Sequence, residues 1–154
     1  MSIFQELSYV MFVLSYFYCL DGNFRVNNGT LEGEGVTIYM RSGGVTINGG
    51  DHLLKAPTGD QWQDATPNYW NGMLFFFSNS NNSDLSIAGN AASEFTGTIY
   101  NYNGDCSLSG TEEAVAFHTQ VVCDQVAISG TGYLDLTYVP EENFTPPTTI
   151  DLVE

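Results

Sequence analysis

The three cysteines, Cys19, Cys106 and Cys123, are the residues whose chemistry is easiest to interpret. No two of them have the C-x-x-C spacing of a zinc or redox site. We favour a Cys106–Cys123 disulfide with Cys19 left over, and such a bond would indicate an oxidising compartment. The alternative is three buried thiols.

The two histidines, His52 and His118, lie 66 positions apart and neither is near a cysteine in sequence. A histidine-centred catalytic or zinc site would need carboxylates that converge on the imidazole, and the sequence places none there. We therefore interpret both as corner or surface residues.

Carboxylates are numerous, with 18 Asp and Glu against three Lys and Arg. Paired carboxylates could serve a glycosidase, but polysaccharide enzymes that act on acidic sugars need cations to neutralise the substrate. Three basic residues are too few for that chemistry. No loop has the regular Asp spacing of a calcium motif. We therefore expect no enzyme, no catalytic residue, no cofactor and no metal site.

An aromatic group occurs in a polar, proline-containing stretch: Trp62, Tyr69 and Trp70. Aromatic side chains are favoured at interfaces, so these three could stack on sugar rings or on a neighbouring subunit. They could instead fold back and cover apolar surface of their own chain. The sequence leaves both interpretations open.

The charge of the chain makes nucleic acids and anionic membranes unfavourable partners. The formal net charge is −15, which repels phosphate backbones and anionic membrane surfaces. Only 14% of residues are charged, against roughly 25% in a typical globular domain. Ser, Thr, Asn and Gly must hydrate the surface instead, as is common in extracellular β-proteins.

Short strands ending in glycine recur along the chain, and in each of them apolar residues alternate with polar or small ones, as in half-buried strands. Their central apolar residues are Val26, Ile47, Ile87, Leu108 and Ile128. The separations are 21, 40, 21 and 20 residues. The value of 40 indicates either an extra repeat or an insertion.

Two further segments complete each repeat. A second strand class, such as Gly35–Tyr39, follows the first, and a brief apolar step lies between them. The step residues are Leu31, Leu54, Phe95, Val115 and Leu134. Three strands per repeat predict a right-handed parallel β-helix (β-solenoid) of about five triangular coils of ~20 residues, whose stacking buries the inward side chains. A β-sandwich is the rival fold, but the spacing repeats by strand type, which favours the solenoid.

The stretch Gly35–Gly50 makes this prediction specific. Ile38 and Ile47 are expected inside the core, and Thr37 and Thr46 outside. Ile47 is expected to stack on Val26.

The same repeat predicts the positions of Thr98 and of two cysteines. Thr98 is also expected to point outward. Cys106 should stack near Val126, and Cys123 lies at the corner just before it. Adjacent coils would bring the two cysteines close to bridging range, which requires Cα atoms roughly 4.4–6.8 Å apart.

Three regions follow from the pattern. Residues 1–18 are an apolar strand or cap segment. Residues 19–138 are the β-helix, with an inserted loop at 57–71. Residues 139–154 are an acidic, proline-containing tail.

Several motifs come in an order that resembles a known family. They are Gly35–Tyr39, Gly72–Phe76, Phe95–Tyr100, Asp105–Gly110 and Gln120–Asp124. Together they resemble the β-helical C-terminal region of bacterial surface proteins labelled as Tad (tight adherence) or Flp pilus-assembly proteins, over roughly Leu20 to Tyr138. The resemblance implies an extracellular or cell-surface protein and supplies no catalytic residues. Such proteins usually carry an N-terminal membrane helix, and residues 1–18 are not a convincing one, which leaves membrane anchoring in doubt.

We therefore expect a non-enzymatic structural protein that self-associates, as an oligomer or filament, by strand exchange at its open β-helix ends. Open strand edges pair readily with another chain. The expected assembly strands contain Tyr9, Val10, Phe12 and Leu14 at one end and Ile150 and Leu152 at the other. The alternative is a carbohydrate-binding or adhesin module that binds a glycan through its aromatic loop.

Overall fold

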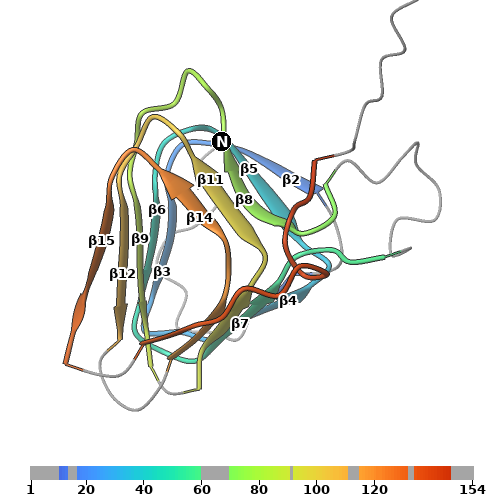
Figure 1. The fold of residues 1–154 in the computed structure, drawn as a ribbon. Helices are drawn as coiled ribbons and strands as arrows, with labels where there is room; N and C mark the ends of the chain where they lie inside the picture. Colours follow the sequence, from blue (N-terminus) through green and yellow to red (C-terminus); the bar gives the residue numbers. More distant parts are fainter. Residues whose placement is uncertain are drawn as a thin grey trace, which may run out of the picture.

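Three parallel sheets form the whole of the described structure (Figure 1). It is a computed structural model that describes residues 11–13, 17–59, 70–90, 92–110, 115–131 and 134–146. Sheet A contains β1 (Met11–Val13), β4 (Leu31–Glu34), β7 (His52–Lys55), β10 (Glu94–Thr96), β13 (Val115–His118) and β16 (Leu134–Leu136). Sheet B contains β2 (Phe17–Asp21), β5 (Thr37–Ser42), β8 (Met73–Phe77), β11 (Thr98–Asn101) and β14 (Val121–Cys123). Sheet C contains β3 (Phe24–Asn27), β6 (Val45–Asn48), β9 (Leu85–Gly89), β12 (Cys106–Gly110) and β15 (Val126–Gly130).

The chain visits the three sheets in the same order in every coil, so that it winds as a β-solenoid of about 5 turns of ~21 residues. Figure 1 looks along the solenoid and shows its triangular section, with sheets B and C on two sides and β4 and β7 on the third. The predicted parallel β-helix is confirmed. A β-sandwich is excluded, because it is built from antiparallel sheets.

The first strand class of each repeat forms sheet C in the expected register. Val26 pairs with Ile47, and Ile47 pairs directly with Ile87, which continues through Leu108 to Ile128. The separation of 40 residues is therefore an insertion and not an extra coil. Part of the insertion lies between β7 and β8, and the turn from 78 to 84 lies between β8 and β9.

The core is a stack of inward side chains from all three sheets. Ile38 is 2% exposed and Ile47 is fully buried, as predicted. The largest fully buried side chains are Phe75, Phe77, Phe95, Phe117, Leu31, Met40, Ile47, Leu54, Leu74, Leu85, Ile87 and Ile99. Many of them are register partners in consecutive coils, such as Ile47 with Ile87 and Phe95 with Phe117.

Thr98 lies on the outer side of sheet B with Phe76 and Tyr100, as predicted, but Thr98 and Thr37 are both buried there, whereas Thr46 is half-buried. Thr37 is fully buried and its Oγ1 donates a hydrogen bond to the Met73 carbonyl at 2.7 Å. Thr98 is 2% exposed, and its Oγ1 accepts a bond from the Phe144 amide at 2.8 Å. Both begin their strands at the corner between sheets A and B, where neighbouring chain covers them.

The apolar step of each repeat is the strand that forms sheet A. The pairing aligns Gly33, Leu54, Phe95, Phe117 and Leu136 across sheet A. A shift of two residues leaves the same face of a strand inward, because side chains alternate with a period of two. The apolar pattern alone therefore does not specify this register.

The end of the described chain turns back along the corner between sheets A and B. Asn143 is 4% exposed there. Its Oδ1 accepts a bond from the Gln120 amide at 2.7 Å and its Nδ2 donates to the Val139 carbonyl at 2.9 Å. Residues 137–146 thus cover outer backbone of earlier coils, at Gly72 before β8 and at Thr98 of β11; Figure 1 shows this segment in red.

At the other end, β1 and β2 are the first strands of the solenoid. Met11 pairs with Leu31, and Phe17 pairs with Thr37. Residue 18 therefore does not mark an architectural boundary, because β2 runs across it.

Candidate functional site

The Cys106–Cys123 disulfide is present, which confirms the predicted pairing. It joins β12 in sheet C to β14 in sheet B, with Cα atoms 6.0 Å apart. Cys106 is 1% exposed, so the bond lies at the edge of the core. Cys19 is a free, exposed thiol on β2. The alternative of three buried thiols is therefore excluded.

The two histidines lie in different environments. His118 is near the surface, with Nδ1 3.7 Å from a carboxylate oxygen of Glu142. His52 is fully buried, with Nε2 2.7 Å from the Gly49 carbonyl and its ring 6.2 Å from that of Phe95. Its Nδ1 is buried without a hydrogen-bond partner among the described residues. His118 meets the expectation of a surface position, and His52 lies at a corner, at the start of β7, but is fully buried.

Burial lowers the pKa of His52, because the core disfavours the charged imidazolium; the Gly49 carbonyl and Asp51 oppose this effect. In the unfolded chain the pKa is about 6.5. Below that pH the unfolded state takes up a proton that the folded state resists, so stability falls as the pH drops. We expect urea midpoints to decrease from pH 7 to pH 5 in the wild type.

The variant His52→Leu should lose most of this pH dependence, and His118→Gln should retain it. Urea melts at pH 5, 6 and 7 measure the effect. Equal slopes of stability against pH in wild type and His52→Leu would contradict the assignment. Carboxylates titrate in all three proteins, so only the difference between them reports on His52.

The part of the chain that the structure describes contains no metal-binding cluster. Within these residues, no group of three or more His, Cys, Asp or Glu side chains could hold a metal ion. The ion pairs found there are peripheral, such as Lys55 with Glu94 at 3.1 Å. The candidate sites are therefore surfaces, one on the outer face of sheet B and one at the C-terminal end of the solenoid.

The outer face of sheet B carries an aromatic ladder, which we define as Phe17, Tyr39, Phe76 and Tyr100. Tyr39, Phe76 and Tyr100 occupy equivalent positions in β5, β8 and β11. Consecutive ring centroids are 6.0, 5.5 and 5.4 Å apart, and the rings are stacked with interplanar angles of 22–24°. The rings therefore use their faces on one another and present their edges outward. Sequence analysis missed the ladder, although an aromatic residue recurs at the same place in the second strand class.

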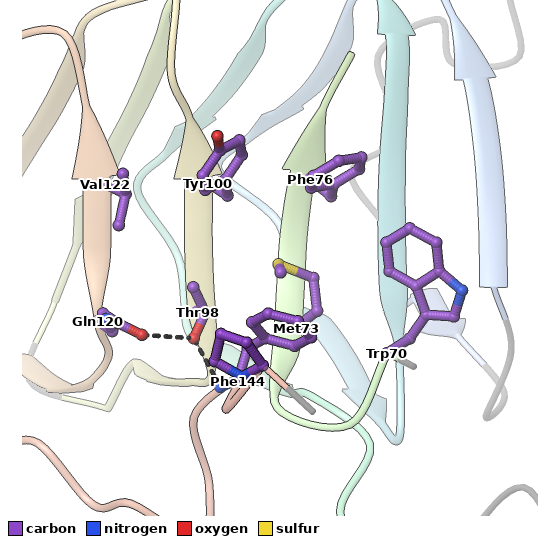
Figure 2. A pocket seen from close by; sticks show the side chains of 9 residues that line it. Trp70, Met73, Phe76, Thr98, Tyr100, Gln120, Val122 and Phe144 are labelled. Atoms are coloured by element: carbon purple, nitrogen blue, oxygen red, sulfur yellow. Dashed lines mark hydrogen bonds between the residues drawn. The ribbon is translucent and has the colours of Figure 1, made fainter. Parts of the chain in front are cut away.

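A groove of about 450 Å³ lies beside the ladder. Figure 2 shows Trp70 on one side and Val122 on the other, with Phe76 and Tyr100 between them and Met73 and Phe144 toward the lower end. Gln120 and Pro146 complete the lining with Thr98. Thr98 and Gln120 are hydrogen-bonded to each other at 3.4 Å, which leaves few free polar groups in the groove.

Trp70 is the one member of the predicted contact loop that the structure describes; Trp62 and Tyr69 lie outside the described residues. The Trp70 ring packs between Phe17 and Phe76, with centroids 5.1 and 5.3 Å away. It is half-buried in this position. These contacts favour the interpretation in which the tryptophan covers apolar surface of its own chain.

The C-terminal end of the solenoid is the second candidate surface. All five residues of β15 are exposed. Val126 and Ile128 are 47% and 56% exposed, although they are in register with Cys106 and Leu108, which are almost fully buried. Leu136 is 44% exposed in the same way above the buried Phe117. Core positions of the last coil are thus left open to solvent.

The predicted assembly residues are mostly not described. Tyr9, Val10, Leu14, Ile150 and Leu152 lie outside the described residues. Phe12 is on β1, opposite Glu32 of its own chain. The outer edges of β1, β2 and β3 at one end, and of β14, β15 and β16 at the other, have no strand partner among the described residues.

The disulfide is compatible with an extracellular location. Across the described ranges, no helix has the length and apolar character to cross a membrane. In comparisons with protein-family models, curated proteins and solved structures, nothing matches this chain. The features that bear on function are therefore the fold, the outer face of sheet B and the C-terminal end of the solenoid.

Proposed function

We propose that this protein is a non-enzymatic structural protein of the cell surface or extracellular space, whose solenoids associate end to end. The observation that carries the proposal is the pair of core positions exposed on β15 at the C-terminal end, Val126 and Ile128. Soluble proteins normally cover such residues, because exposed apolar side chains and open strand edges pair with other chains.

Side-chain burial alone does not account for a stable contact. Val126 and Ile128 are about half exposed, so covering them is worth about 1 kcal/mol each, half of the 1.5–3 kcal/mol for complete burial. Association costs at least about 4 kcal/mol in lost freedom of motion. The free edges of β14 and β15 must therefore also pair with strands of a partner, which is how a parallel sheet extends.

Charge opposes association, because each copy carries a net charge of −15. Salt screens this repulsion over about 8 Å at physiological ionic strength. Assembly is therefore expected to increase with salt, in contrast to a contact made by ion pairs. The disulfide and the low charge density of the surface support an oxidising, extracellular setting.

Electron microscopy and sedimentation velocity of the purified protein at neutral pH test the proposal. We expect short filaments or oligomers whose fraction rises with protein concentration and with salt from 20 to 300 mM. Calcium is added in a parallel series to detect a divalent requirement. Monodisperse monomers under every condition would contradict self-assembly.

A carbohydrate-binding or adhesin module is the second candidate, and the groove beside Trp70 is the observation that favours it. The stacked ladder weakens this candidate, because sugars bind to free ring faces and here the rings cover one another. A glycan array with wild type and Trp70→Ala decides: binding by the wild type that is lost in the variant would support the module. Ser107→Ala on sheet C is the matched control.

A further inference from the structure

The ends of the solenoid do not match perfectly, and this mismatch determines how two copies can join. Sheet A has six strands, whereas sheets B and C have five each. The C-terminal end therefore consists of β14 and β15 from the fifth coil and of β16, which begins a sixth. The N-terminal end begins with β1, β2 and β3 of the first coil.

A head-to-tail join extends sheets B and C, and it requires Phe24 of the second copy, which is only 4% exposed, to exchange its present contacts for Val126 of the first. The β2 strand of a second copy lies beside β14, and its β3 lies beside β15. Extending the observed register places the second copy's Val26 beside Ile128 and its Cys19 beside Val122. Inward apolar positions then meet inward apolar positions, and the exposed residues of β15 become core.

Sheet A has room for only one strand at this join, between β13 of the first copy and β4 of the second. Two strands compete for the place: β16 of the first copy and β1 of the second. Each has only three residues and one described strand partner. Either β16 of the first copy or β1 of the second must leave sheet A before sheets B and C of the two copies can pair.

Register and charge favour β1. If β16 stayed, Asp135 would lie directly opposite Glu32 of the second copy, and like charges opposite one another in a sheet are destabilising. If β1 stayed, Phe12 would lie opposite Ala116. An apolar residue opposite alanine carries no such cost.

We propose that two copies join head to tail, with the β1 strand of one copy displacing β16 from sheet A of the other. This inference rests on the proposed function, and it names the partner surface, the polarity and the register of that contact. In the free protein β16 acts as a removable cover, which limits assembly until a second copy replaces it.

The native Cys19 thiol allows a direct test of the register. Parallel partners in adjacent strands lie about 4.8 Å apart, which is within the Cα range for a disulfide. The variant Val122→Cys, oxidised under assembly conditions, should give a ladder of covalent multimers on a non-reducing gel. Peptide mapping should find Cys19 linked to the cysteine introduced at position 122.

Two controls are matched to this variant. Ala127→Cys lies at the same end of the solenoid, but its partner in the join is Arg25, so it should not link to Cys19. Val122→Cys combined with Cys19→Ser should give no multimers. That double variant has one free thiol per chain, so covalent dimers would show that two C-terminal ends meet, which overturns the head-to-tail polarity.

Two substitutions distinguish displacement of β16 from association through a simple apolar patch. Ile128→Asp removes a contact of the join and should reduce the assembled fraction at least tenfold. Leu136→Asp weakens β16, and should increase the assembled fraction several-fold. A simple apolar patch predicts a decrease for both variants, so a decrease for Leu136→Asp overturns the displacement of β16.

The outcomes also separate this inference from the function on which it rests. A wild type that assembles while Val122→Cys fails to link through Cys19 contradicts the register, and end-to-end association survives. A wild type that never assembles contradicts both.

Discussion

Replacing Phe75 by alanine is expected to lower the free energy of unfolding by about 3–5 kcal/mol, as is usual for a large aromatic side chain in a core. Phe75 is fully buried, and the strand register places it between Ile38 and Ile99 of the neighbouring coils. No side chain can collapse into the space that it leaves without shifting the stack. Urea denaturation, analysed as a two-state transition, measures the loss.

Phe76 is the matched control, because it is the next residue of the same strand and points outward. It is half-buried in the aromatic ladder, with the Tyr39 and Tyr100 rings 5.5 and 5.4 Å away. Aromatic pairs contribute about 0.5–1.5 kcal/mol each beyond their buried area, so Phe76→Ala should cost less than Phe75→Ala. An equal or larger cost for Phe76→Ala would mean that the outer face, and not the interior, carries the stability.

Removing the disulfide with Cys106→Ala and Cys123→Ala together is expected to cost about 3 kcal/mol, the value for a closed loop of this size. The two cysteines are separated by 17 positions and connect the last complete coil to the one before it. Without the bond, the C-terminal coil should unfold first, because that coil has neighbours on only one side. The urea midpoint of the double variant and of the reduced wild type should fall together.

Cys19→Ala controls for loss of a thiol, and should change stability by less than about 0.5 kcal/mol, since Cys19 is exposed. Unchanged midpoints in the double variant would contradict a structural role for the bond. A fall in the reduced wild type alone would point instead to a strained pair of thiols in the folded protein.

The sequence was sufficient for the architecture because the repeat has a physical cause. Inward positions such as Ile47, Ile87 and Leu108 need apolar side chains in phase, and corners need residues that tolerate positive φ. Gly50 illustrates the corner: its φ is 89°, and a Cβ there would collide with the Gly29 carbonyl of the previous coil. Both requirements can be recognised in a single sequence, the first as periodic apolar residues and the second as recurring glycines.

Other features leave no such signal. Thr37 and Thr98 have the alternation of outward residues, but lie at a corner that distant chain segments cover. The register of sheet A is ambiguous by two residues, since positions two apart, such as Leu31 and Gly33, are on the same face of their strand. Contacts with distant segments determine the burial of these threonines and the register of sheet A. Local periodicity in the sequence does not encode either property.

Some features of the candidate sites could also be predicted from the sequence, and others could not. The cysteine pairing was predictable, because Cys106 and Cys123 belong to adjacent coils of the repeat. The exposure of Ile128 was not, because its surroundings in sequence are those of the buried Ile47 and Ile87. Only the number of coils shows that Ile128 lies at an end, and the number of coils is a property of the whole chain.

Amide hydrogen exchange of the wild-type protein, at low and high concentration, tests most directly whether the solenoid ends join. In the free protein the outward amides of β15 and β3 should exchange quickly, while those of β9, paired on both sides, exchange slowly. We predict that β15 and β3 both gain protection as concentration rises and that β9 does not change. Association detected by sedimentation without added protection in either edge strand would contradict the end-to-end account.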